Sequence, residues 1–201
     1  MKILNELDYK QLIKEYSVPL SDQPAIFVAD YASYNEGHIS GAWFDLDDFA
    51  DYEDFMNSIK EFFLKLDKVA PLDFFIPREE MMFQDWQSIP DHFIGESSLD
   101  PELWEYLDAL RKDDGFEDIY EAFIGATGQH APPAEILNRL MVNLNSFDNG
   151  SHLSPEEKYG YFMKESGCIE IPPSCEPYFD FEMYGAEMLA VTSYCNGFVF
   201  N

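Results

Sequence analysis

Positive charge is what this sequence has least of. Twelve of its 201 residues are Lys or Arg, against 39 Asp and Glu, so the formal net charge is −27 and the sequence pI is about 4.1. Proteins that bind nucleic acid or an anionic membrane surface hold phosphate groups with clusters of Lys and Arg. The shortage of these residues argues against both classes of ligand.

Long apolar runs and paired cysteines are also lacking. No apolar run approaches the roughly 18 residues of a membrane span. The first sixteen residues carry charges throughout, so we expect no signal peptide. Cys168, Cys175 and Cys195 are odd in number and lack the spacing of a metal site. We expect them to be reduced, partly buried thiols in a cytoplasmic protein.

Motifs of catalytic and metal-binding sites are missing as well. The four histidines are scattered, which favours neither a zinc site nor a Cys–His pair. No phosphate-binding glycine loop occurs, and the acidic stretch from Asp45 has Ala50 and Met56 where a calcium loop needs Gly and Glu. We predict no catalytic residue, no cofactor and no metal ion. A hydrolase with a carboxylate pair stays open, because no two of the many acids stand out.

The abundant residues predict a folded α+β protein. The chain is 46% hydrophobic and 16% aromatic, whereas disordered acidic tails are poor in aromatics. Asp51 is a predicted N-cap of a helix that extends to about Leu66. Its predicted apolar face comprises Phe55, Ile59, Phe62, Phe63 and Leu66. Strands are predicted at residues 25–30, 38–44, 72–76 and 81–86. These elements make a predicted N-terminal α+β domain, residues 25–95, with an antiparallel sheet and one packed helix.

Other segments flank this domain. Residues 1–24 are predicted to be a helical extension and linker, with a helix over 1–16. Its apolar face is expected to hold Ile3, Leu7, Ile13 and Tyr16. Helical periodicity predicts a central helical domain over residues 96–146. Its helices are expected to start at Asp100, at Asp113 and at Pro132, and the third to continue to about Leu144. A C-terminal α+β domain is predicted over residues 147–201. It comprises a helix capped by Ser154, an aromatic segment over 178–189 that is helical or irregular, and a hairpin around Asn196-Gly197.

The acids are unevenly distributed. Six fall within the ten residues 45–54, and no Lys or Arg occurs between Glu15 and Ile59. Most acidic clusters are solvated helix starts, and this explanation is the plainest one. Concentrated like charge nevertheless costs stability through self-repulsion, which suggests a use for it. The net charge of −27 equals that of roughly 45 Å of duplex DNA, or about 14 base pairs, at one charge per 1.7 Å.

Three stretches resemble the ArdA antirestriction proteins. They are YNEG-x3-G-x-WFDL at residues 34–46, MFQDW-x-x-IP at 82–90, and YFDFEMYGAEM at 178–188. Their order and spacing agree with the family, and the resemblance covers the chain from about Ala25 to its end.

This resemblance implies a function that needs no chemistry. ArdA proteins are carried on mobile genetic elements and imitate bent B-form DNA. They occupy the DNA groove of type I restriction-modification enzymes, formed by the methyltransferase core with its specificity subunit, and block restriction and often modification. The resemblance also implies an elongated chain of three small domains and a homodimer through the C-terminal domain. An acidic interaction module for another basic DNA-binding protein, such as a nucleoid protein, remains the alternative.

Together, the charge pattern and the resemblance predict an acidic surface that mimics DNA. The predicted set comprises Asp45, Asp47, Asp48, Asp51, Glu53, Asp54, Asp85, Glu102, Glu105, Asp108, Asp113, Asp114, Glu117, Asp118, Glu121, Glu165, Glu170, Asp180, Glu182 and Glu187.

Overall fold

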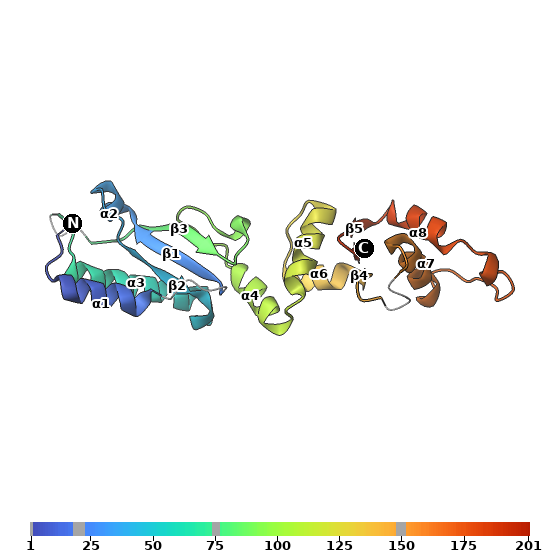
Figure 1. Ribbon diagram of the computed structural model, residues 1–201. Helices are drawn as coiled ribbons and strands as arrows, with labels where there is room; N and C mark the ends of the chain where they lie inside the picture. The colour runs from blue at the N-terminus through green and yellow to red at the C-terminus, as the bar shows by residue number, and fades with distance from the viewer. Residues whose placement is uncertain (1, 18–22, 74–76, 148–151) are drawn as a thin grey trace. The chain divides into compact units, whose positions relative to one another are not determined.

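Figure 1 shows a computed structural model of the chain, which describes residues 2–17, 23–73, 77–147 and 152–201. The fold is mixed α+β, as predicted, and its described residues form eight α-helices and two three-stranded antiparallel sheets. Contacts divide the chain into an N-terminal unit, Met1–Trp104, and a C-terminal unit, Glu105–Asn201. The division at residues 25–95, 96–146 and 147–201 stays a prediction.

The N-terminal unit is built on a sheet of order β2-β1-β3. Its strands are β1 (Ala25–Asp30), β2 (Gly41–Asp45) and β3 (Met81–Gln87). Gly41 lies so close to Val28 that a Cβ would collide with its carbonyl oxygen. The predicted strand at 72–76 is not formed at Leu72 and Asp73, and residues 74–76 lie outside the described residues.

A short helix, α2 (Tyr31–Asn35), connects β1 to β2. Asp30 caps this helix by accepting a hydrogen bond from the Ser33 amide at 2.7 Å. Gly37 then turns the chain with a φ of +82°, a conformation that glycine adopts without steric cost. Because α2 and this turn occupy the connection, β2 begins at Gly41 rather than at the predicted residue 38.

The long helix α3 (Tyr52–Val69) supplies the core of the N-terminal unit. The spacing of its apolar residues follows the helical period, and all five residues of the predicted apolar face are buried. Asp51 caps the helix, as predicted, and the helix ends three residues later than expected. The helices α1 (Glu6–Tyr16) and α3 contact each other and run together along the sheet (Figure 1).

The inward face of α1 differs from the prediction. Leu12 is buried, whereas the side chain of Leu7 is 72% exposed. The helix begins only at Glu6, with Asn5 as its N-cap. Before α1, the Leu4 amide donates to the carbonyl of Val69, the last residue of α3. The Lys2 amide donates to the carbonyl of Pro71, two residues further along. These bonds tie the start of the chain to α3 and leave a different stripe of α1 facing the core.

In the C-terminal unit, helices precede and interrupt a sheet of order β4-β6-β5. Its helices are α4 (Leu103–Lys112, which begins two residues before the unit), α5 (Phe116–Thr127), α6 (Pro133–Arg139), α7 (Pro155–Glu165) and α8 (Phe181–Leu189). Its strands are β4 (Leu140–Asn143), β5 (Ser193–Cys195) and β6 (Phe198–Phe200). The predicted hairpin is confirmed, with Asn196 and Gly197 both at positive φ.

The helix predicted from Pro132 to about Leu144 was wrong beyond Arg139. Residues 140–143 form β4, which pairs with β6 near the end of the chain. Local periodicity favours a helix here, but the strand ladder with a partner some sixty residues away satisfies the backbone instead. The helical and C-terminal segments therefore share one sheet.

The helices α7 and α8 pack against each other (Figure 1). Gly160 and Gly185 allow this close approach, because a Cβ on either would collide with the backbone of the opposite helix. The ambiguous segment at 178–189 is thus helical from Phe181. Cys168 and Cys175 are free thiols, as expected, but they are exposed rather than partly buried.

Candidate functional site

The acidic stretch 45–54 connects β2 to α3 and contains the short 3-10 helix Leu46–Asp48. The Asp45 carboxylate accepts a hydrogen bond from the Asp47 amide at 2.9 Å. Asp51 accepts one from the Asp54 amide at 2.9 Å, and Asp54 accepts one from the Ala50 amide at 3.3 Å. Aspartate suits these positions because its short side chain satisfies amides that a helix start leaves unpaired. Three carboxylates therefore fix the local backbone.

Aromatic side chains anchor the same stretch to the core. The rings of Phe44, Phe49 and Phe55 lie 5.2–6.3 Å apart, centroid to centroid. Leu46, between them in sequence, is fully buried. Asp45 is half-buried, and the other five acids of the stretch are exposed. Buried apolar residues thus alternate with solvent-facing carboxylates, which gives the charges a rigid base.

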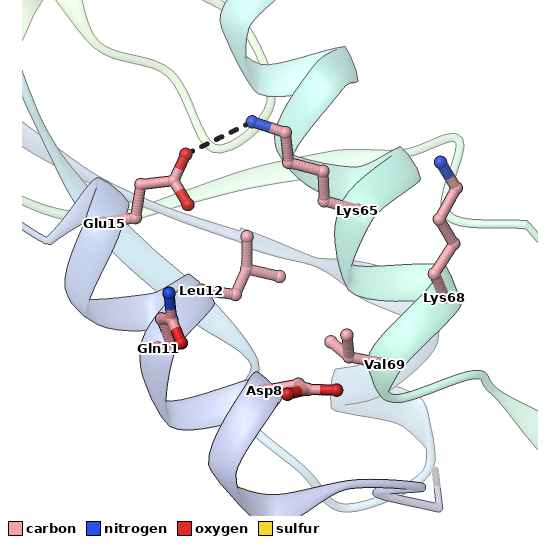
Figure 2. Close-up of a pocket in the computed structure, with 7 residues that line it drawn as sticks. All are labelled: Asp8, Gln11, Leu12, Glu15, Lys65, Lys68 and Val69. Atoms are coloured by element: carbon pink, nitrogen blue, oxygen red, sulfur yellow. Dashed lines mark hydrogen bonds and ion pairs between the residues drawn. The ribbon is translucent and has the colours of Figure 1, made fainter.

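The α1–α3 face of the N-terminal unit has a different charge pattern. Six of the twelve Lys and Arg residues lie between residues 2 and 68. Figure 2 shows the groove between the two helices, where Lys65 Nζ lies 3.4 Å from a carboxylate oxygen of Glu15. Lys65 also donates to the Tyr16 hydroxyl and pairs with Glu61 at 3.1 Å. These partners, the Tyr16 hydrogen bond first, raise the pKa of Lys65. Two acids on this face, Glu15 and Glu61, thus share one lysine.

One group of acids is internal, and sequence reasoning missed it. Arg78 Nε donates to the Asp30 carboxylate at 3.0 Å, and both side chains are fully buried. Arg78 also binds the Asp67 carboxylate and donates to the Ala70 carbonyl at 2.9 Å. Asp30 and Asp67 therefore hold α2 and α3 together around one arginine. The only sequence signal was an isolated Arg between Lys68 and Arg111 in an acid-rich chain.

In the C-terminal unit, acids gather on α4, α5 and the turn between them. The members of the predicted set here are Glu105, Asp108, Asp113, Asp114, Glu117, Asp118 and Glu121, and all are exposed. Asp108 pairs with Arg111 at 2.9 Å. Burial, with the nearby charges of Glu117 and Glu121, raises the pKa of Tyr106. Two of these carboxylates therefore oppose ionisation of a buried tyrosine.

The remaining predicted acids are exposed as well. They are Asp85 and Glu102 in the N-terminal unit, and Glu165, Glu170, Asp180, Glu182 and Glu187 in the C-terminal unit. Asp180 caps α8 through the Met183 amide at 2.9 Å, and Glu182 accepts from the Ser154 hydroxyl at 3.0 Å. Nineteen of the twenty predicted carboxylates therefore face solvent, and Asp45 is half-buried.

Comparison with protein families assigns the chain to one of them. A family model described as Antirestriction protein (ArdA) matches residues 26–199. The chain belongs to the ArdA family. A parallel comparison with curated proteins gave no match. The family assigns an antirestriction function directed at a restriction enzyme, and ArdA proteins are non-enzymatic inhibitors. The hydrolase alternative is thereby removed.

The ArdA-like stretches lie on distinct elements. The first, residues 34–46, covers the end of α2 and the whole of β2, and the second, residues 82–90, forms most of β3. The third, residues 178–188, forms most of α8. The first stretch ends where the acidic run begins, so the ArdA-like backbone positions those carboxylates. The helix α1 precedes the matched region.

Two features are absent from the residues that the structure describes. No group of three or more His, Cys, Asp or Glu side chains there is arranged to hold a metal ion. No helix among those residues has the length and apolarity to cross a membrane.

Proposed function

We propose that this ArdA protein inhibits type I restriction-modification enzymes by occupying their DNA groove. Its exposed carboxylates take the place of DNA phosphates and bind the Lys and Arg side chains that normally hold the duplex. The observation that carries this proposal is that nineteen of twenty predicted acids are solvent-facing. Restriction is blocked by competition, and modification is blocked with it because both reactions need the same bound DNA.

The charge and its distribution support this mimicry. The N-terminal unit holds 22 acids against 7 bases, and the C-terminal unit holds 17 against 5, so both units contribute. Acids three or four positions apart on one helix lie roughly 5–6 Å from each other, which gives a dense row of negative charge. The alternation of anchored apolar residues and exposed acids keeps such rows in place when a cationic groove approaches.

We further propose that the protein acts as a homodimer formed through its C-terminal part. Large apolar side chains are exposed there: Tyr178 is 89%, Met183 62% and Val191 80% exposed. Exposed apolar side chains of this size in the C-terminal unit support an interaction surface there. A dimer would carry twice the charge, equivalent to roughly 90 Å of duplex DNA.

A competition experiment tests the proposal. A type I methyltransferase is bound to labelled duplex DNA, and the purified protein is titrated against it at several salt concentrations. We expect the DNA to be displaced at low salt and the apparent affinity to fall steeply as salt rises, because salt screens the opposed charges. Absence of displacement at low salt from every type I enzyme tested would contradict the proposal. Binding to a nucleoid protein alone would favour the alternative instead.

A further inference from the structure

The C-terminal unit contains an apolar groove bounded by α4, α5 and α6. Its volume is about 330 Å³. Ala109 lines it from α4 and Phe116 from α5, and α6 contributes Pro133, Ala134 and Leu137. Phe116 is 1% exposed and belongs to the core, whereas Leu137 is 48% exposed. The groove therefore exposes apolar surface that is continuous with the core.

Negative charge surrounds this apolar surface. Glu105, Asp108 and Asp113 line the groove, together with a single cation, Lys112. All three carboxylates are exposed and belong to the predicted DNA-mimic set. Two of them have local partners, because Asp113 accepts a hydrogen bond from the Gly115 amide at 2.9 Å and Asp108 pairs with Arg111. An apolar centre within an acidic rim is complementary to an apolar side chain flanked by Lys or Arg.

The position of Leu137 is unusual for its helix. Its neighbour Ile136 is fully buried, and Pro133 one turn earlier is also buried. Leu137 itself lies at the groove rather than in the core. A single exposed leucine is common on protein surfaces, but Leu137 lines the same groove as the buried Phe116, so the two contribute to one apolar surface.

We propose that this groove binds an apolar side chain on a Lys- or Arg-flanked segment of the restriction enzyme. This inference rests on the proposed function and adds a component to it that duplex phosphates cannot supply. The carboxylates on the rim attract the cationic flanks, and the groove removes the apolar side chain from water. Burial of apolar surface is insensitive to moderate salt, whereas attraction between exposed charges is screened. The groove would thus maintain binding at salt concentrations that weaken the carboxylate contacts.

Two substitutions at exposed positions test the groove. Leu137→Ala removes one wall, and Ala134→Trp fills the space from the same helix. The control is Leu64→Ala on α3, where the leucine is 63% exposed and lies outside the groove. Each variant is titrated against a type I methyltransferase bound to labelled DNA, from low to moderate salt. Circular dichroism and sedimentation velocity establish that each variant is folded and has the oligomeric state of the wild type.

We expect the groove variants to displace DNA less well than the wild type, by the same factor at every salt concentration. Leu137→Ala should weaken displacement roughly five- to tenfold at every salt concentration, with the slope of log affinity against log salt unchanged. Ala134→Trp should weaken it as well, and Leu64→Ala should match the wild type.

Three results would overturn the inference, and they are distinguishable. If the wild type displaces DNA and both groove variants equal it, the inference fails while the proposed function stands. If Leu137→Ala changes the oligomeric state, the groove is a contact between copies of the chain. If the wild type displaces no DNA, the proposed function is wrong, and the inference, which rests on it, is wrong as well.

Discussion

At the scale of single residues, aspartate has three separate uses in this protein, and burial separates them. Asp30 is fully buried and paired with Arg78. Asp51 is exposed and caps α3. Asp48 is exposed within the acidic stretch, in the set proposed to face the restriction enzyme. The capping role was predictable from the sequence because it depends on residues three apart. The buried pair was not, because its members are 48 positions apart.

Loss of Arg78 should destabilise the N-terminal unit. The substitution Arg78→Met leaves the buried Asp30 carboxylate without its partner, and breaking a buried ion pair from one side costs about 3–5 kcal/mol. Urea denaturation measures the change in the free energy of unfolding. Lys68→Met, on the α1–α3 groove, is the control and should change it by less than about 1 kcal/mol. Equal stability of the Arg78 and Lys68 variants would show that the buried network contributes little.

Ionisation of the buried Tyr106 should lower the stability of the folded protein at alkaline pH. Burial and neighbouring carboxylates raise its pKa in the folded state, so folding favours the protonated phenol. Its contribution to stability is complete below the unfolded pKa of about 10 and is lost as pH rises through the folded pKa. The free energy of unfolding should therefore decline above pH 10, and Tyr106→Phe should make that decline shallower. An identical pH dependence in the variant would contradict this role.

At the scale of elements, the sequence predicted best where local signals agree with packing. The helix α3 has an N-cap and a regular apolar face, and both features were correctly predicted. Residues 140–143 have helical periodicity, but they pair with β6, and no local pattern reports a partner that far away. The exposure of the acids followed from helix faces. The groove beside Leu137 could not be predicted from the sequence, because it depends on how three helices pack.

The helix α1 should contribute measurably to the fold around the acidic stretch. Tyr16 packs against Phe44 at 5.6 Å and Phe62 at 5.0 Å between ring centroids, and Phe44 directly precedes Asp45. Tyr16→Ala should lower the free energy of unfolding by about 1–3 kcal/mol through lost aromatic packing. Thermal and urea denaturation measure this change. Tyr16→Phe retains the ring and should recover most of the loss, whereas equal effects of the two substitutions would assign it to the hydroxyl and Lys65.

At the scale of the whole molecule, net charge dominates the energetics. With a net charge of −27, the folded chain repels itself, and salt screens this repulsion over a Debye length of about 10 Å at 0.1 M. The midpoint of thermal unfolding should therefore rise between low and moderate salt, by about 2–4 °C for each kcal/mol of relief. Scanning calorimetry in sodium chloride measures it. A flat response would mean that the exposed acids are already compensated.

The most direct measurement compares position with charge. One variant neutralises Asp47, Asp48 and Glu53 in the acidic stretch. A second neutralises Glu6, Glu15 and Glu61, which pair with lysines on the α1–α3 face. Both change the net charge by the same amount, and inhibition of a type I restriction enzyme is measured for each. If the carboxylates replace phosphates at specific positions, the first variant should inhibit the enzyme markedly less than the second. Equal inhibition by the two variants would contradict mimicry and leave only bulk charge.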